Sequence, residues 1–532
     1  MGIFKKANNI YITVRDTYTS ISGSSYEEAE EVIIEATNGD LELVSQKKVI
    51  MQGLGNNSNK NDQEPRESPK NEVKYIVLFN RLPSYEGEFG FDWMREEYLT
   101  ENGICVEGIE ELKKIYTPLK TNVKNNTTQE PYGDYYVPWL IMFPNHKDKI
   151  GKDVKLNVLV PTEYISDEYH TNSEIEEFSF IPSNAALCVE PQKINIDKCV
   201  MGEEITIYCD APLENDEFIE VKNSKGSIVG KLNVMRNAHY KQLSINIHAI
   251  KSYITDSPSY GKNIIDTKLV NGGGLQAIED YLNKNSLNQA LIQVKIVNKE
   301  KPYDWGFSSS SLEIANKGRN PKDNKEDFLY QKFEGMKEII NGKEKFDTVK
   351  ILDFFHLQFG LKEYNLVNGK GAKSILLYLA SVESKDAGGA AYMIPLDNRQ
   401  CIIFQSNLEY FPSYAHEIGH ILGLPHTFKG GDSYEQLISK KENEITIYNQ
   451  WLNNNSEYVR RNPNDENVSK VRRYINYIEK IIQAYEKIKL YDIYKFKEKT
   501  TENIMDYDLS NRKSFTIWQI RIMQEEVLNY YH

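Results

Sequence analysis

The sequence predicts a multidomain protein in which β-rich modules precede an α/β (α+β) domain. Three observations support this division. The chain has 532 residues, more than one hydrophobic core covers, so about three or four domains are expected. Between residues 172 and 250, short apolar runs alternate with turn signals at intervals of about ten residues. From residue 255 onward, patterns typical of strands alternate with patterns typical of helices.

The first 71 residues divide into a small β-rich segment, 1–55, and a linker, 56–71. Short β-like runs in the first segment are separated by polar turns such as Asn38-Gly39-Asp40. The linker is rich in Asn, Pro and charged residues and has no apolar periodicity. The first segment resembles the N-terminal segments of bacterial type VI secretion cargo. That resemblance implies a secretion-apparatus partner that binds the N-terminal region.

Two β-rich modules follow the linker. Residues 72–165 predict an α+β or mostly β module, with a strand at 74–80 and a helix at 108–115. Residues 172–250 predict an immunoglobulin-like β-sandwich, because several short strands are bounded by turn signals. We expect the sandwich to act as a spacer or adhesion module.

Residues 255–532 predict the α/β domain. The near-continuous apolar run at 374–382 is typical of a central strand, and strands are expected to follow at 388–396 and 400–404. Residues 433–490 form a long insertion with helical spacing, which predicts a helical hairpin over the cleft. The charged residues of this hairpin are typical of a solvated face. The alternative is that the hairpin is a lid that selects substrates.

A histidine motif lies between the strands and the insertion: His416-Glu417-x-x-His420-x-x-Gly423-x-x-His426. The first two histidines are four residues apart, so on a helix both imidazoles lie on one face and can reach one metal ion. Glu417 can point into that site without being a ligand. Gly423 would end the helix in a left-handed turn, and His426 would then arrive as a third nitrogen ligand. Three ligands and an open fourth position are typical of catalytic zinc.

This motif resembles that of the metzincin clan of zinc metalloproteases, in which the extended histidine motif is followed by a Met-turn. All five fixed positions match, and Asn503-Ile504-Met505-Asp506-Tyr507 resembles the Met-turn. Within the clan, both stretches are most similar to the pappalysin-like peptidases. Two surface histidines on an amphipathic helix are the alternative for an isolated pair, and the extended spacing disfavours that alternative.

The resemblance implies a zincin-type catalytic domain with one Zn²⁺ ion bound by His416, His420 and His426. It implies that Glu417 is the general base that takes a proton from the attacking water and passes it to the leaving amine. An intact acid at this position favours catalysis over a purely structural metal site.

The resemblance assigns further roles around the metal. It places Met505 under the metal as the structural residue of the Met-turn. It implies that Tyr507 binds the metal at rest and moves to stabilise the oxyanion. It also makes the strand near Ala390–Pro395 a candidate edge that pairs with an extended substrate backbone.

The resemblance of the motif predicts a zinc endopeptidase that acts on a protein or peptide, and the resemblance of the N-terminal segment implies an exported bacterial effector or toxin. Lys and Arg total 64 against 77 Asp and Glu, and the net charge of −13 argues against a nucleic-acid partner. No apolar run reaches the roughly 18 residues that span a membrane. A non-catalytic binding or adhesion protein with a structural metal site, and a zinc amidase acting on a non-protein polymer, remain alternatives.

The cysteines and the N-terminus leave further alternatives open. Cys188, Cys199 and Cys209 could form one disulfide or remain free thiols, and Cys105 is a candidate for blocking the zinc in a latent form. Residues 1–14 lack the apolar core of a secretory signal. The protein therefore stays in the cytoplasm, leaves by a route such as type VI secretion, or is already the mature form of a longer precursor.

Overall fold

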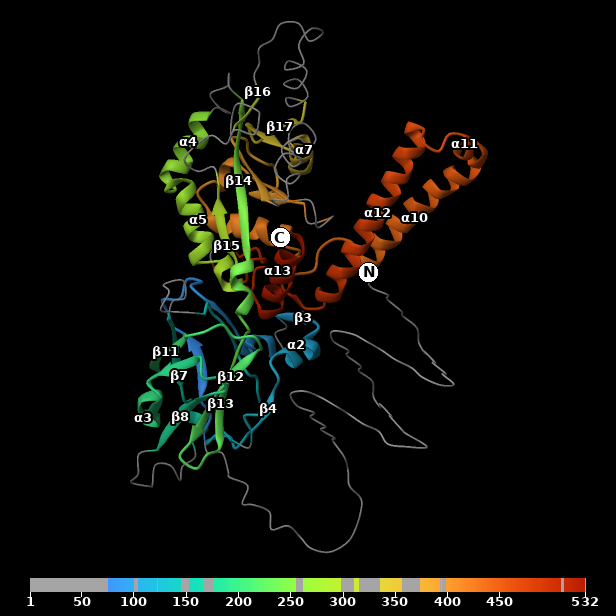
Figure 1. Cartoon of the computed structure of the whole chain (residues 1–532). Helices are drawn as coiled ribbons and strands as arrows, with labels where there is room; N and C mark the ends of the chain where they lie inside the picture. Colours follow the sequence, from blue (N-terminus) through green and yellow to red (C-terminus); the bar gives the residue numbers. More distant parts are fainter. Residues whose placement is uncertain are drawn as a thin grey trace, which may run out of the picture. The chain divides into compact units, whose positions relative to one another are not determined.

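The structure is a computed structural model, and residues 70–532 form one compact unit. The described residues are 75–99, 104–121, 123–144, 153–165, 176–254, 262–297, 311–314, 335–355, 374–392, 394, 399–508 and 511–531. The predicted β-rich segment 1–55 and the linker 56–71 lie outside these residues. The chain is a mixed α+β protein with several sheets (Figure 1).

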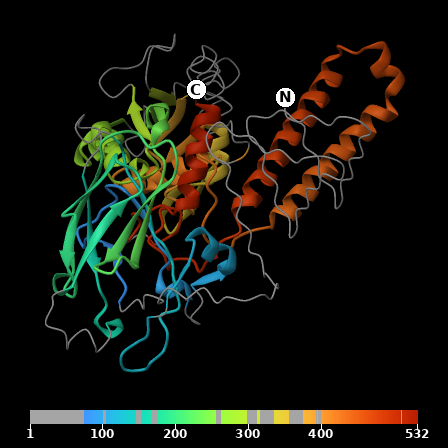
Figure 2. The ribbon, with the colours of Figure 1, turned by 60° about the horizontal axis from the view of Figure 1, so that its bottom comes forward.

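Two β-sheets enclose the first core of the unit (Figure 2). One sheet has the order β1-β7-β11-β9, and the other has the order β10-β8-β12-β13-β6-β2. Their bounds are β1 Leu78–Arg81, β2 Gly90–Asp92, β6 Trp139–Ile141, β7 Val154–Leu159, β8 Glu177–Pro182, β9 Leu187–Glu190, β10 Lys193–Asn195, β11 Glu203–Cys209, β12 Glu217–Asn223 and β13 Ile228–Val234. Phe79 of one sheet contacts Phe180 of the other, with ring centroids 6.2 Å apart. The sheets therefore form a sandwich with a shared interior.

The sandwich differs from the predicted division into modules 72–165 and 172–250. Each sheet takes strands from both segments, so the second segment is not a self-contained immunoglobulin-like sandwich. β13 and β6 also pair in parallel, between residues far apart along the chain, such as Asn233 and Trp139. Local alternation predicts that a strand exists, but it carries no information about such distant pairing. The sequence patterns therefore indicated strands in these segments, but the division of those strands into two separate modules is wrong.

A mixed sheet forms the centre of the C-terminal part. Its order is β15-β14-β19-β21-β20, with β16 also paired to β14. The bounds are β14 Ser244–Ile254, β15 Gln293–Ile296, β16 Ser311–Ile314, β19 Ser374–Ala380, β20 Gly389–Ala391 and β21 Gln400–Ile403. All neighbours are parallel except β20 and β21, which are antiparallel. β14 begins before the expected boundary at residue 250, so the start predicted for this domain, residue 255, is too late.

Both faces of this sheet are covered, and β19 shows how. Ile375, Leu377 and Leu379 belong to one core, whereas Leu376, Tyr378 and Ala380 belong to another. Successive side chains of a strand point to opposite faces, so a strand buried on both faces is apolar throughout. This confirms the prediction of a central strand at 374–382.

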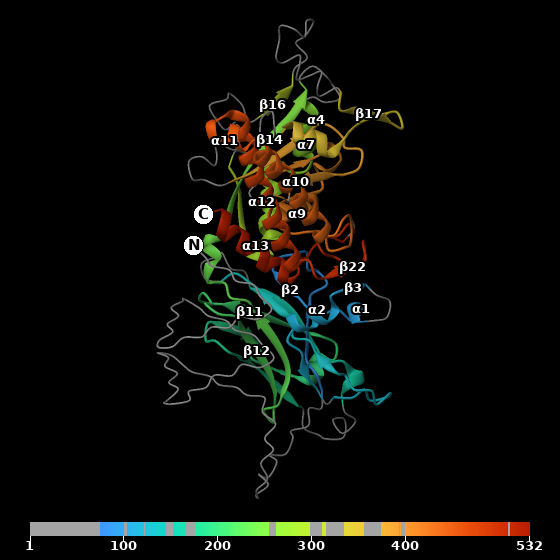
Figure 3. The ribbon, with the colours of Figure 1, turned by 90° about the vertical axis from the view of Figure 1, so that its right-hand side faces the viewer.

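Helices cover the two faces. α4 Lys262–Asn271, α5 Gly274–Lys284, α9 Phe411–Ile421 and α13 Ile517–Tyr530 share the core of one face, and α7 Thr348–Phe355 packs on the other. Figure 3 shows α9 and α13 near the middle of the view. Smaller elements are α1 Glu96–Leu99, α2 Ile109–Ile115, α3 Ile196–Cys199, β3 Cys105–Glu107, β4 Leu119–Lys120, β5 Asp134–Tyr135, β17 Lys337–Ile340, β18 Lys343–Phe346 and β22 Lys495–Phe496.

The insertion at 433–490 is helical, as predicted. α10 Tyr434–Asn454 and α12 Glu466–Tyr491 run side by side, joined through α11 Ser456–Arg461 (Figures 1 and 2). A capping box between Ser433 and Gln436 begins α10. Among the described residues, no helix combines the length and the apolar character needed to cross a membrane.

A buried carboxylate joins the sandwich to the last helix. Asp92 of β2 is fully buried and accepts hydrogen bonds from the Tyr116 hydroxyl at 2.8 Å and from the Ile517 amide at 2.9 Å. Ile517 is the first residue of α13, so Asp92 satisfies a backbone N–H that the helix itself leaves unpaired. Arg95 forms an ion pair with the same carboxylate at 3.3 Å.

Replacing this carboxylate is expected to destabilise the protein. Asp92→Ala leaves a tyrosine hydroxyl and a helix amide without their acceptor and takes from Arg95 one of its two carboxylate partners, the other being Glu502. Breaking a buried pair costs about 3–5 kcal/mol. The measurement is the urea midpoint followed by tryptophan fluorescence. Glu96→Ala, a change at an exposed neighbour, is the control. An unchanged midpoint in Asp92→Ala would contradict the structural role of this contact.

Candidate metal centre

The helix α9 carries the first two histidines of the motif. It begins after Tyr410 with Pro412 in its first turn, where a missing amide hydrogen costs nothing. It ends at Ile421, and Gly423 takes a φ of 85°, the left-handed conformation that favours glycine. The predicted end of the helix is thereby confirmed. The chain turns there and brings His426 back toward the helix.

Three imidazoles converge at one point. The Nε2 atoms of His420 and His426 are 3.1 Å apart, and those of His426 and His416 are 3.3 Å apart. The Nδ1 atoms of His416 and His420 lie 2.8 and 2.7 Å from the carbonyl oxygens of Ile504 and Leu424. A carbonyl oxygen only accepts, so both Nδ1 atoms carry the hydrogen and both Nε2 atoms present lone pairs. These three histidines can hold a metal ion.

The surroundings of the cluster disfavour charge on the rings. Burial lowers the pKa of His416 well below its usual value and lowers the pKa of His420 to about 4 and that of His426 to about 3. Burial also raises the pKa of Glu417 to about 8, and the charge of Arg512 opposes that shift. The rings are therefore neutral near pH 7, the form in which histidine binds metals.

Glu417 lies beside the cluster under the edge strand of the sheet. Its side chain is 6% exposed. A Cβ atom added to Gly389 of β20 would lie 2.7 Å from Glu417 Oε1, so the strand backbone passes directly against this carboxylate. Only glycine permits that approach without displacing the carboxylate. The sequence did not single out Gly389, because the contact joins residues far apart in the chain.

The predicted Met-turn lies against the motif helix. Met505 is fully buried, and its sulfur would lie 2.6 Å from a Cβ atom added to Gly419. The preceding residue, Ile504, supplies the carbonyl oxygen that holds His416. Asn503 accepts a hydrogen bond from the Met505 amide at 2.8 Å and donates one to Gln519 of α13 at 2.7 Å. The turn therefore positions one of the three imidazoles.

Enlarging the contact between helix and turn is expected to disturb both stability and metal binding. Gly419→Val places new carbon atoms against the buried Met505 sulfur, and such overpacking costs about 1–3 kcal/mol. The displaced turn carries Ile504, so the metal affinity should also fall. Thermal unfolding and metal titration measure the two effects. Gly430→Val is the matched control, because a Cβ there meets nothing within 4 Å. Equal effects of both variants would argue against this packing.

Tyr507 lies at the open side of the cluster. Its ring centroid is 4.8 Å from that of His426, 5.7 Å from that of His416 and 4.8 Å from that of Phe428. The residue is 37% exposed. The structure thus brings the tyrosine of the predicted turn to the histidines.

Residues beyond the insertion hold the third histidine in place. Lys495 Nζ donates to the His426 carbonyl oxygen at 3.1 Å, and the Phe496 amide donates to Thr427 at 2.8 Å. Sequence reasoning missed both, because 69 residues separate Lys495 from His426 and no local pattern joins them. The chain therefore runs from the metal centre into the insertion and returns to the metal centre just after it.

The cysteines show no disulfide. All five are free, so the open alternative for Cys188, Cys199 and Cys209 is settled in favour of free thiols. Cys105 lies in β3, and its sulfur donates to the Glu107 carbonyl oxygen at 3.4 Å. The structure gives it no contact with the three histidines among the described residues.

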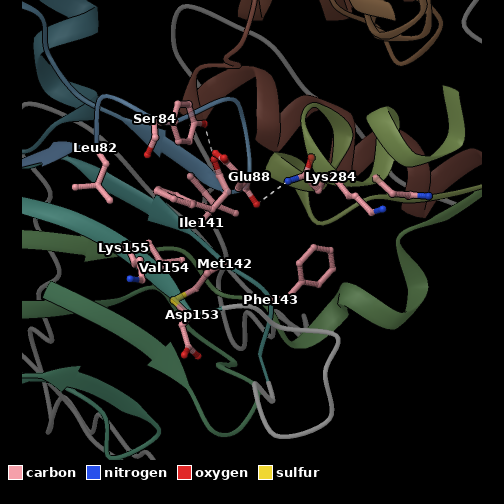
Figure 4. A pocket seen from close by; sticks show the side chains of 14 residues that line it. Leu82, Ser84, Glu88, Ile141, Met142, Phe143, Asp153, Val154, Lys155 and Lys284 are labelled. Atoms are coloured by element: carbon pink, nitrogen blue, oxygen red, sulfur yellow. Dashed lines mark hydrogen bonds between the residues drawn. The ribbon is translucent and has the colours of Figure 1, made fainter. Parts of the chain in front are cut away.

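A separate pocket lies where the sandwich meets the end of α5 (Figure 4). Its walls include Tyr85, Phe143, Lys155 and Lys284. None of the predicted site residues lines it. The residues that the sequence motif singles out therefore lie at the histidine cluster and not in this pocket.

Comparisons with known proteins add no relative. No protein-family model matches the sequence, and no curated protein matches it. One solved structure, described as "Structure of a chaperone-substrate complex", aligns with 12% sequence identity and a TM-score of 0.19, covering 44% of this chain and 29% of that chain. A TM-score of 0.19 is too low to indicate a shared fold. The fold and the cluster define the chain as a mixed α+β protein with a candidate three-histidine metal centre.

Proposed function

We propose that the protein is a zinc-dependent endopeptidase of metzincin-like type. The observation that carries the proposal is the triangle of Nε2 atoms beside a buried glutamate. Tetrahedral zinc with Zn–N distances of 2.0–2.1 Å would separate its nitrogen ligands by about 3.3 Å. The observed separations of 3.1 and 3.3 Å fit that value. The Nε2 atoms of His416 and His420 present lone pairs at this point, because their Nδ1 atoms donate to backbone carbonyl oxygens.

Each residue of the site would have its own role in the proposed chemistry. A bound zinc ion would supply a Lewis acid that polarises a carbonyl group and lowers the pKa of water toward about 7. Glu417 would take the proton of the attacking water and pass it to the leaving amine. Tyr507 would stabilise the oxyanion from the open side of the cluster. Buried imidazoles hydrogen-bonded through Nδ1 keep the ligands oriented.

The edge strand β20 is the proposed docking site for an extended peptide. It pairs with β21 on one side, and no other described strand pairs with it. An extended substrate could add to that edge through backbone hydrogen bonds. The backbone at Gly389 would then carry the substrate past Glu417, its nearest carboxylate neighbour. This arrangement supports a protein or peptide as the substrate.

The helical insertion borders the same edge. Ile394, three residues beyond β20, packs with Ala484 and Ile488 of α12. We therefore propose that the hairpin is a wall of the substrate groove, in keeping with the lid alternative. The role of an exported effector or toxin rests on the resemblance of the N-terminal segment alone.

One experiment separates the competing functions. Protein loaded with one zinc ion per chain is incubated with casein, and the products are analysed by mass spectrometry. Cleavage that a chelator stops and zinc restores is the expected result. Zinc binding without cleavage of casein or of peptidoglycan would favour a structural site in a binding protein. Cleavage of peptidoglycan alone would favour the amidase.

A further inference from the structure

A buried arginine follows the predicted Met-turn. Arg512 lies between Met505 and α13 and is 9% exposed. Its Nε atom is buried without a hydrogen-bond partner. No hydrogen bond or ion pair joins its guanidinium to another residue in the part of the chain that the structure describes. A guanidinium in such a place is costly unless an anion meets it.

The guanidinium lies close to the tyrosine that borders the candidate metal centre. Its central carbon lies 5.6 Å from the ring centroid of Tyr507, the same ring that contacts His416 and His426. Its charge acts on Glu417, and the charge of Glu417 acts on it in return. Arg512 therefore lies at the side of the reaction space, near the groups that would meet the scissile bond.

The neighbouring carboxylate of the turn is already engaged. Asp506 accepts hydrogen bonds from the amides of Lys499 and Thr501 and from the Thr501 hydroxyl. Elsewhere in the chain, the largely buried Arg81 and Arg95 both form ion pairs with Glu502. Arg512 differs from these two because no protein carboxylate pairs with it among the described residues. A binding site for an external anion explains that difference.

We propose that Arg512 binds a carboxylate of the substrate next to the scissile bond, so that the enzyme selects acidic peptides. The inference rests on the proposed peptidase function. The planar guanidinium can hold a carboxylate through two parallel hydrogen bonds. Two sources share this chemistry: the side chain of an Asp or Glu residue, and the free carboxylate at a peptide C-terminus.

Binding and turnover of matched peptides test the proposal. One set carries Asp or Glu beside the cleavage site and an amidated C-terminus, and its partner set carries Asn or Gln. A third set has neutral side chains and a free C-terminal carboxylate. Dissociation constants are measured on zinc-loaded Glu417→Gln protein, which should bind without cleaving, and kcat/KM is measured on the protein with Glu417 intact.

A carboxylate is expected to improve binding and kcat/KM by roughly 10-fold to 100-fold, from the strength of hydrogen bonds to charged groups. The set that shows the preference identifies the source of the carboxylate. Arg512→Gln should abolish the preference, whereas Arg512→Lys should keep part of it. Arg521→Gln, a change at an exposed arginine paired with Asp216, should leave it intact.

Two results would overturn the proposal. One is equal binding of acidic and amide peptides by the protein with Arg512, a result that needs no variant and so does not depend on the folding of Arg512→Gln. The other is an equal loss of affinity and of kcat/KM for all peptides in Arg512→Gln. That result would mean that the arginine contacts a group common to every substrate. Acid-selective peptide binding in zinc-loaded protein that cleaves nothing would support the role of Arg512 and count against the peptidase function.

Discussion

Glu417→Gln is expected to lower peptide hydrolysis by a factor on the order of 10²–10⁴, the usual contribution of a general base. Glutamine has nearly the same shape but cannot accept the proton of the attacking water. The three imidazoles do not depend on this side chain, because backbone carbonyl oxygens hold His416 and His420. The variant should therefore keep one metal ion per chain. Rates on a peptide substrate and metal content by mass spectrometry are the two measurements.

The control for this variant is Glu409→Gln. Glu409 lies just before α9 and pairs at the surface with Lys268, so its loss should leave the rate unchanged. Retained hydrolysis in Glu417→Gln with metal bound would remove the glutamate from the mechanism. Loss of the metal as well would mean that the carboxylate supports the ligands.

His420→Ala is expected to abolish both metal binding and hydrolysis. Removing a partner that only orients a ligand costs about 10-fold to 100-fold in metal affinity, so removing a ligand should cost more. A metal that binds only the folded state stabilises it by about 2.7 kcal/mol at 100 times its dissociation constant. Zinc should therefore raise the melting temperature of the protein with all three histidines, and His420→Ala should not respond.

His239→Ala is the matched control, because His239 is exposed and lies in the segment Ala238–Gln242, away from the motif. Its response to zinc should equal that of the unchanged protein. The unchanged protein treated with a chelator should melt at about the same temperature as His420→Ala in the presence of zinc. Any remaining difference should reflect the packing that is lost with the imidazole. A zinc response that survives in His420→Ala would place the ion elsewhere.

The local part of the site could be predicted from the sequence. The spacing of His416 and His420 on a helix and the left-handed turn at Gly423 are short-range properties, and the structure agrees with them. The proximity of Met505 and Tyr507 to the motif came from resemblance, because about 80 residues of chain, the helical insertion among them, lie between His426 and Met505. The structure brings both to the motif.

Other contacts of the site had no local signal. Gly389, Lys495 and Arg512 reach the centre from three separate segments, and nothing in their neighbouring residues indicates it. The prediction of the fold from the sequence has the same limit. Apolar patterns located strands such as β19 and β21, but they did not reveal that 72–165 and 172–250 share both sheets of one sandwich. Pairing between distant strands depends on the whole core.

The path of β14 has a practical consequence for dissecting this protein. This 11-residue strand follows directly on the sandwich and lies between β15 and β19 in the sheet that carries the metal centre. A recombinant fragment cut at residue 250 would sever the strand and expose apolar edges on both pieces. A fragment designed to keep the candidate metal centre therefore has to include the whole of β14. Any natural cleavage that leaves the candidate metal centre folded has to spare this shared strand.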